Sequence, residues 1–221
     1  MKRLLLPISL LYSFVLFLRH KLYDWKILKS KSYNIPNIFV GNLNLGWTGK
    51  TPHIEYLIRL LSDKYDIAVL SRGYGRKTQG YLLANDTHTH NDIGDEPLQY
   101  FTKFNNIKVA VDESRCEGME RLLQENNPPQ VVLLDDAYQH RKIKPGLNIL
   151  LTDYYSLYSD DHLVPAGNLR DIKKAAQRAE IIVVTKSPNV ITPYYRRDVE
   201  NKLKPLPHQK VFYSYIEYLD F

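Results

Sequence analysis

The chain has 221 residues, of which 44% are hydrophobic and 24% are charged, a balance typical of a folded protein rather than a disordered or collagenous one. Its single cysteine, Cys116, excludes an intrachain disulfide and indicates a reducing compartment. The net charge of +6 lies within residues 1–32, and the remaining residues carry equal numbers of basic and acidic side chains. Because nucleic-acid-binding proteins usually have a basic surface on the folded body, this distribution argues against that class.

The first predicted element is an uncharged, apolar stretch of 15 residues at 4–18, with basic residues on both sides. As a helix it would be about 22 Å long, shorter than the roughly 30 Å hydrocarbon core of a bilayer. No small-residue cleavage site follows, which argues against a signal peptide, whereas a buried core helix stays open. We favour a helix that dips into one leaflet and contacts anionic lipids, with Tyr12, Tyr23 and Trp25 at the interface.

This interpretation predicts two parts: a membrane-associating segment at 1–32 and a catalytic domain at 33–221. Within the second part, short aliphatic runs alternate with amphipathic segments. The predicted strands are 38–40, 67–70, 108–111, 131–134, 149–151, 181–184 and 210–215. The predicted helices are 53–63, 97–104, 113–125, 171–179 and 194–204. Uninterrupted aliphatic strands separated by helices predict an α/β doubly wound fold with a mainly parallel sheet. The polar stretch 80–95 is predicted to be a long loop near the site.

A glycine-containing loop follows the strand at 38–40 and precedes a helix, which is the order that a phosphate-binding loop requires. Its predicted nucleotide-binding residues are Asn44, Leu45, Gly46, Trp47, Thr48, Gly49, Lys50 and Thr51. Backbone N–H groups would face the phosphates, Lys50 would neutralise their charge, and Thr51 would bind Mg²⁺. Asn44 stands where the strict pattern has glycine, and because Asn tolerates positive φ, we expect this departure to be mild.

Two acids end the next aliphatic strand. Asp135 and Asp136 follow 131–134, so the strand would deliver a carboxylate to the edge of the sheet beside Mg²⁺. Adjacent carboxylates repel each other unless a cation lies between them. A strand that ends in a solvated turn is the alternative, and the preceding phosphate loop argues against it.

Two further motifs leave more open. Arg72, Gly73 and Tyr74 lie in a basic, glycine-containing segment directly after the strand at 67–70, which suits a phosphorylated partner but also an ordinary solvated turn. Asp95 precedes Glu96 and Pro97. It could cap a helix or take a proton from an acceptor hydroxyl, and the spacing alone does not decide between these roles.

In this order, the motifs resemble those of the tetraacyldisaccharide 4′-kinase family of lipid A synthesis. The matching segments are 40–43, 49–52, 70–75, 94–97, 135–140, 165–170 and 184–186. The resemblance implies a P-loop NTPase-like fold that uses ATP and Mg²⁺. It also implies transfer of the γ-phosphate to the 4′-hydroxyl of a tetraacyldisaccharide 1-phosphate, at the cytoplasmic face of the inner membrane. We expect a peripheral or monotopic protein and a monomer.

The resemblance also assigns roles by motif. The implied catalytic residues are Asp95, as base, and Lys50. The implied metal-site residues are Thr51, Glu96, Asp135 and Asp136. The implied substrate-binding residues are Arg72, Gly73, Tyr74, Gln139 and His140. We expect the lipid kinase, but two departures from the family pattern motivate an alternative, namely an ATP-binding, membrane-associated switch or inactive relative. Trp47 replaces a family glycine, and the family usually continues well beyond Phe221, to a histidine that assists the base.

Overall fold

The computed structural model describes residues 5–46 and 48–217, so Trp47 lies outside the described residues. The chain divides into two compact units. Unit 1 comprises Met1–Leu28, Gly41–Gly49 and Asn148–Phe221, and unit 2 comprises Lys29–Val40 and Lys50–Leu147. These are structural units, and the functional boundary that we place after residue 32 stays a prediction.

Unit 2 contains a mainly parallel sheet. Its strands are β1 (Asn37–Asn42, whose last two residues belong to unit 1), β2 (Ile67–Ser71), β3 (Leu82–Leu83), β4 (Ile107–Val111) and β5 (Val131–Asp135). They are ordered β3-β4-β2-β5-β1, and only β3 is antiparallel to its neighbour. All five residues of β2 and of β5 are buried, because helices cover both faces of the sheet.

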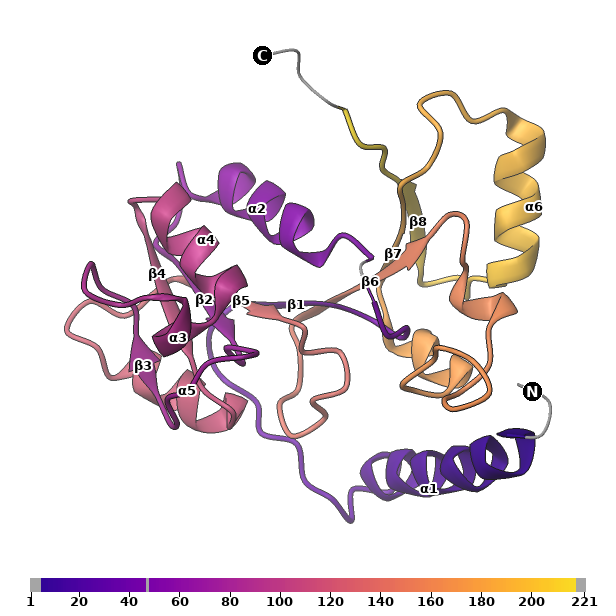
Figure 1. The fold of residues 1–221 in the computed structure, drawn as a ribbon, viewed down its shortest axis with the longest axis horizontal. Coiled ribbons are helices and arrows are strands. Elements are labelled where there is room, and N and C mark those ends of the chain that lie inside the picture. Colours follow the sequence, from indigo (N-terminus) through magenta and orange to yellow (C-terminus); the bar gives the residue numbers. More distant parts are fainter. Residues whose placement is uncertain (1–4, 47, 218–221) are drawn as a thin grey trace. The chain divides into compact units, whose positions relative to one another are not determined.

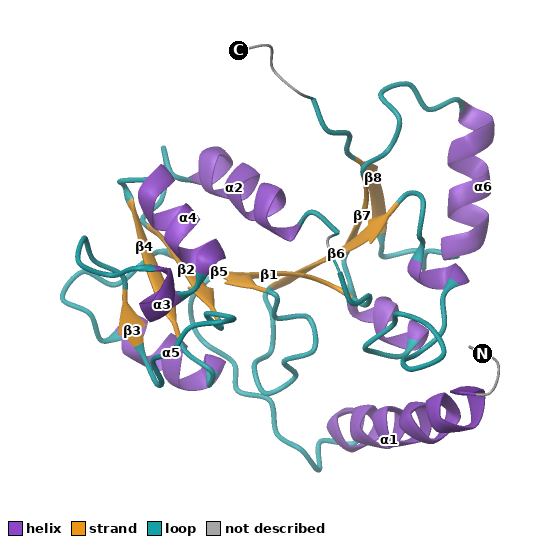
Figure 2. Ribbon diagram, viewed as in Figure 1, coloured by secondary structure: helices purple, strands orange, loops and turns teal. Residues whose placement is uncertain are grey.

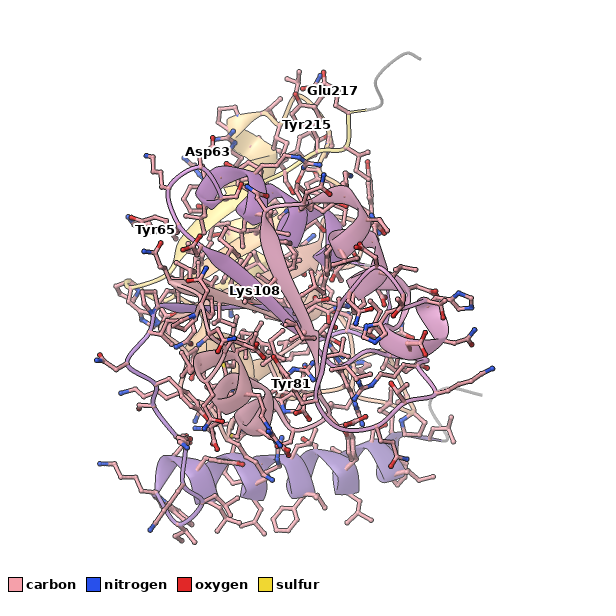
Figure 3. The ribbon with its side chains drawn as sticks, turned by 90° about the vertical axis from the view of Figure 1, so that its left-hand side faces the viewer. Asp63, Tyr65, Tyr81, Lys108, Tyr215 and Glu217 are labelled. Atoms are coloured by element: carbon pink, nitrogen blue, oxygen red, sulfur yellow. The ribbon has the colours of Figure 1, made fainter. Side chains whose placement is uncertain are left out.

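Four helices accompany this sheet. They are α2 (Lys50–Leu61), α3 (His90–Ile93), α4 (Asp95–Lys103) and α5 (Arg115–Leu123). Figure 1 shows α2 and α4 on one face of the strands and α5 on the other. Asp63 and Tyr65 mark the turn between α2 and β2, and Lys108 lies on β4 (Figure 3). Side chains from α5 and four strands (β1, β2, β4 and β5) form one apolar core, which includes Phe39, Leu70, Met119 and Leu134.

Unit 1 contains three parallel strands in the order β6-β7-β8. They are β6 (Leu147–Asp153, whose first residue belongs to unit 2), β7 (Ile181–Thr185) and β8 (Lys210–Tyr213). Its helices are α1 (Leu6–Asp24), α6 (Pro193–Leu203) and the 3₁₀ segments η2 (Tyr158–Asp160) and η3 (Lys173–Arg178). Figure 2 shows α6 beside β7 and β8, and α1 alongside the irregular segment that follows β6.

The predicted α/β fold with a mainly parallel sheet is confirmed, and the differences are local. The segment 171–179 forms only a 3₁₀ helix, and the strand predicted to reach Tyr215 ends at Tyr213. The loop at 80–95 contains β3 and α3, whose start Thr89 fixes through a capping box with Asp92. The N-terminal helix continues beyond the apolar stretch to Asp24, because no Gly or Pro interrupts it between residues 18 and 24.

Candidate functional site

The phosphate-binding loop begins at the end of β1 and leads into α2 at Lys50. Gly46 and Gly49 have φ values of 121° and 80°, conformations that glycine adopts without steric cost. Asn44 is not among the residues with positive φ, so the predicted reason for accepting Asn there is wrong. It is buried, and its side-chain Nδ2 donates to Asp161 Oδ2 at 3.4 Å. Asn44 therefore ties the loop to a neighbouring segment of unit 1.

The first residue of α2 lies close to the acids at the end of β5. Lys50 Nζ is 3.9 Å from Asp136 Oδ1, and both side chains are partly exposed. Asp136 has a left-handed backbone with φ of 48°, which turns the chain directly after the strand. Lys50 and Asp136 are 86 positions apart in sequence, yet they meet at the same edge of the sheet of unit 2.

Asp135 is the most deeply buried acid of this group, with 4% exposure. The Tyr100 hydroxyl donates to Asp135 Oδ2 at 3.2 Å, whereas Oδ1 has no hydrogen-bond partner among the described residues. Burial, together with the charge of Asp136, raises the pKa of Asp135 to about 6. A buried carboxylate with one unpartnered oxygen is costly unless another positive group or donor completes it.

A single hydroxyl connects this acid to the start of α2. Tyr100, on α4, is fully buried and also hydrogen-bonds the side chain of Thr51. Burial and the neighbouring Asp135 raise the pKa of Tyr100, so the phenol stays protonated and can donate. Tyr100 thus fixes the relative positions of Thr51 and Asp135. The sequence did not single it out, because it looks like an ordinary core residue of an amphipathic helix.

These oxygens fit a magnesium ion. No cluster of three or more His, Cys, Asp or Glu side chains suited to a metal occurs in the described part of the chain. Mg²⁺ does not need such a cluster, because it keeps several waters and commonly binds one or two carboxylates together with substrate phosphates. The unpartnered Asp135 oxygen, the neighbouring Asp136 and the Thr51 hydroxyl supply that kind of donor set.

Arg115 is a second residue that the sequence analysis missed. It is 2% exposed, and its guanidinium donates to the backbone oxygens of Asp112 (2.7 Å) and Asp135 (3.1 Å). Burial lowers its pKa to about 10, which leaves it charged at neutral pH. Arg115 therefore fixes the backbone at the end of β5 and places a positive charge near Asp135 and Asp136. Its position at the start of α5 gave no motif by which to recognise it.

Asp95 and Glu96 are exposed and form the first turn of α4. The N-cap of this helix is Gly94, so the alternative that Asp95 caps the helix is wrong. Glu96 lies close enough to raise the pKa of Tyr100. The first turn of α4 thus presents Asp95 to solvent, while the same helix carries Tyr100 to Asp135.

Glycines bring the segment after β2 against the start of α4. A Cβ atom on Gly94 would lie 2.9 Å from the Tyr74 backbone oxygen, and one on Gly73 would lie 2.8 Å from that of Ile93. The close approach requires glycine at both positions, which also have positive φ. It brings the exposed residues Arg72 and Tyr74 into the neighbourhood of Asp95.

Gln139 and His140 lie in the turn that follows Asp136 and are half-buried. The His140 backbone N–H donates to Ala137 O at 2.8 Å, which closes the turn. The turn places both residues near the acids along the chain. Their predicted role in binding substrate, like the other assigned roles, stays a prediction.

Comparison with known proteins relates the chain to one family. The family model for tetraacyldisaccharide-1-P 4′-kinase matches residues 1–213. The chain is 51% identical over 215 residues to a tetraacyldisaccharide 4′-kinase of Bacteroides thetaiotaomicron, and covers 57% of it. It is 50% identical over 218 residues to that of Flavobacterium johnsoniae, and covers 64% of it. These alignments include 97% and 99% of this chain.

A solved structure agrees in fold and in sequence. The crystal structure of LpxK from Aquifex aeolicus in complex with ATP matches with a TM-score of 0.78 and 31% identity, over 97% of this chain and 81% of that one. The two curated relatives are longer than this chain, which spans somewhat less than two thirds of their length.

Proposed function

Because the chain belongs to the tetraacyldisaccharide-1-phosphate 4′-kinase family, we propose that it carries the nucleotide site of a lipid kinase. This kinase transfers the γ-phosphate of ATP to the 4′-hydroxyl of a tetraacyldisaccharide 1-phosphate. The observation that carries the proposal is the group at the sheet edge of unit 2. There Lys50, at the start of the helix after a phosphate loop, lies beside Asp136 and the buried Asp135, whose Oδ1 has no hydrogen-bond partner among the described residues.

The phosphates would bind at the N-terminus of α2, where free backbone N–H groups and the helix dipole favour anions. Lys50 neutralises negative charge on the β- and γ-phosphates. Thr51, Asp135 and Asp136 would hold Mg²⁺, which, when bound, offsets the charge on the phosphate oxygens. Tyr100 keeps Thr51 and Asp135 in fixed positions, so little reorganisation is needed when nucleotide enters.

Asp95 would act on the acceptor. It is exposed at the start of α4, where it can receive the proton of the sugar hydroxyl as that oxygen forms its bond to the γ-phosphorus and ADP leaves. Arg72 and Tyr74, beside it, are exposed and available to the phosphorylated sugar, with Gln139 and His140 as further contacts. The chemistry then rests on positioning and charge.

A transfer assay tests this proposal. Labelled phosphate should move from [γ-³²P]ATP to tetraacyldisaccharide 1-phosphate, and Asp95→Asn should slow the transfer about 10²- to 10⁴-fold without weakening ATP binding. Lys50→Ala should reduce transfer by about 10²- to 10³-fold. Asp63→Asn and Lys64→Ala, exposed residues beyond the end of α2, are the matched controls. Intact ATP binding without any transfer would favour the switch, and transfer unaffected by Asp95→Asn would remove the proposed base.

We also propose that the chain binds the cytoplasmic face of the inner membrane as a peripheral monomer. The outer face of α1 carries exposed apolar side chains, namely Leu10, Leu11, Phe14, Val15, Phe17 and Leu18. Among the described helices, none has the length and apolarity needed to cross a bilayer. A helix with one exposed apolar face and flanking basic residues suits the interface of an anionic membrane.

Substitution on this face provides the test. Phe14→Glu should release the protein from vesicles that contain phosphatidylglycerol, because a carboxylate would enter the apolar layer. Tyr56→Glu, on the exposed side of α2, is the matched control, since the two rings are 62% and 60% exposed. Vesicle binding that survives Phe14→Glu would contradict the proposed membrane surface.

A further inference from the structure

A segment of unit 1 connects α1 to the phosphate-binding loop. This segment, which we call the bracket, comprises residues 161–171 between η2 and η3. It is folded tightly on itself: Leu169 N donates to His162 O and Val164 N donates to Leu169 O, each at 2.9 Å. A Cβ on Gly167 would lie 2.2 Å from His162 O, so the turn admits only glycine without rearrangement. The bracket is therefore a stiff connection rather than a loose loop.

One side of the bracket holds the front of the nucleotide loop. Leu45 N donates to Asn168 O at 2.6 Å, and Arg170 N donates to Leu43 O at 2.8 Å. The Arg170 guanidinium donates to Asn42 Oδ1 at 2.5 Å, and the bond from Asn44 to Asp161 adds a further contact. These bonds set the backbone path of residues 42–45, directly before the glycines of the loop.

The other side of the bracket holds α1. Ser9 Oγ donates to Leu163 O at 2.9 Å and accepts from Ala166 N at 3.0 Å. His20 Nε2 lies 2.6 Å from Asp171 Oδ1, and both side chains are almost fully buried. The Tyr12 hydroxyl donates to Arg170 O at 3.4 Å. Because the hydroxyl points inward and Tyr23 is buried, only Trp25 of the three aromatic residues expected at the membrane interface is exposed.

The two faces of α1 serve different partners. Ser9, Leu16, His20 and Tyr23 are buried against unit 1, whereas the outer face is apolar and exposed. In Figure 3, side chains project from α1 on the side away from the rest of its unit. A lipid surface can therefore cover the outer face without displacing the bracket. A helix of this kind is held more firmly when both faces are covered, because most helical stability in proteins comes from packing of the helix surface.

We propose that the bracket couples membrane docking of α1 to nucleotide binding, so that an anionic lipid surface and ATP strengthen each other's binding. This coupling rests on the proposed nucleotide site and membrane surface. Docking favours the seated position of α1, which favours the bracket conformation that holds residues 42–45 in place. The freedom that the loop must lose on binding ATP is then smaller. Ser9 and Tyr12 are positioning residues in this scheme, because they act on the loop only through the bracket.

Thermodynamic linkage gives a test that needs no variant. The dissociation constant for ATP is measured by calorimetry with and without vesicles that contain phosphatidylglycerol, and vesicle partitioning is measured with and without ATP. Vesicles should tighten ATP binding by about fivefold or more, and ATP should tighten vesicle binding by the same factor. Vesicle binding with an unchanged ATP constant would overturn the coupling alone. Failure to bind vesicles at all would overturn the membrane surface together with it.

Variants then locate the coupling in the bracket. Ser9→Ala removes the two bonds that Ser9 makes to the bracket but leaves the contact between His20 and Asp171, so it should lower the coupling factor without abolishing it, and Tyr12→Phe should lower it less. Ser13→Ala, one turn further along α1, is the matched control, because Ser13 makes no side-chain hydrogen bond with the described residues. Equal coupling in Ser9→Ala and Ser13→Ala would contradict the role of the bracket.

Discussion

Two buried aspartates, one in each unit, differ in their surroundings. Asp171 in unit 1 has a fully buried side chain, and its carboxylate meets His20 at 2.6 Å, Arg178 at 3.5 Å and the backbone N–H of Ile172 at 2.8 Å. Asp135 in unit 2 is nearly as buried, yet among the described residues its carboxylate accepts a hydrogen bond only from the Tyr100 hydroxyl, and its other oxygen has no hydrogen-bond partner.

The difference distinguishes Asp171, a structural acid, from Asp135, an acid of the proposed nucleotide site (the site acid). Burying a carboxylate costs several kcal/mol, which partners of opposite charge and hydrogen bonds offset. At Asp171 the offset comes from the chain itself, so the acid holds α1 and the bracket together. At Asp135 the offset is incomplete, and a second acid lies next to it. The unliganded fold therefore retains part of the free-energy cost of burying Asp135. This is expected where a cation and phosphates complete the site on binding.

The largest effect on stability is expected from breaking the partnered acid. Asp171→Ala leaves His20 and Arg178 without their carboxylate and should lower the free energy of unfolding by about 3–5 kcal/mol. Urea unfolding measures the change. Asp198→Ala, which breaks the exposed pair with Lys202 on α6, is the matched control and should change little. If both variants lose the same small amount, Asp171 is not the structural acid described here.

The opposite sign is expected at the site acid. The pKa of Asp135 rises from 3.8 in the unfolded chain to about 6 in the folded one, so the folded state binds the proton more tightly. Stability from this group is therefore present below pH 4 and is lost as the pH rises through 6. Asp135→Asn avoids the loss and should stabilise the nucleotide-free protein above pH 6 by up to about 3 kcal/mol.

Thermal unfolding between pH 4 and pH 8 checks this prediction. The advantage of Asp135→Asn should disappear toward pH 4, where the wild-type carboxyl is protonated. Addition of ATP and Mg²⁺ should raise the unfolding temperature of the wild type more than that of Asp135→Asn, because the variant lacks one charged ligand. A variant that is less stable than the wild type at pH 8 without ligand would contradict the comparison.

A smaller effect is expected from the hydroxyl that links Asp135 to Thr51. Tyr100→Phe removes both hydrogen bonds and should cost about 1 kcal/mol of stability. It should also raise the Mg²⁺ concentration needed for half-maximal transfer, because the two proposed ligands are no longer held together. Tyr158→Phe is the control, since this buried ring makes no side-chain hydrogen bond with the described residues. An unchanged Mg²⁺ requirement in Tyr100→Phe would remove the positioning role.

The smallest effect is expected at an exposed acid. Glu120 meets Lys31 at 2.6 Å, but both side chains are about half exposed, so water and salt screen the pair. Glu120→Gln should leave the unfolding midpoint nearly unchanged at high salt and shift it slightly downward at low salt. A large loss at high salt would show that burial does not distinguish these three acids.

Much of the site could be recognised from the sequence because its elements are local. A strand, a glycine loop and Lys50-Thr51 follow one another in a single segment, and Asp135-Asp136 follow a run of aliphatic residues. Local order and periodicity are sufficient for such features, because backbone geometry fixes them within a few residues. The same reasoning gave the strands and the parallel sheet, and it failed for short or irregular elements such as η3 and α3.

What the sequence by itself determined was therefore the fold class and the presence of a phosphate loop with two acids. Only the tertiary structure decided that Asp95 is no helix cap, that Tyr100 joins Thr51 to Asp135, and that Arg115 supports the end of β5. It also joined α1 to the nucleotide loop through the bracket. The reason is physical: these contacts connect residues 20 to 157 positions apart, and no periodic pattern records which distant side chains meet.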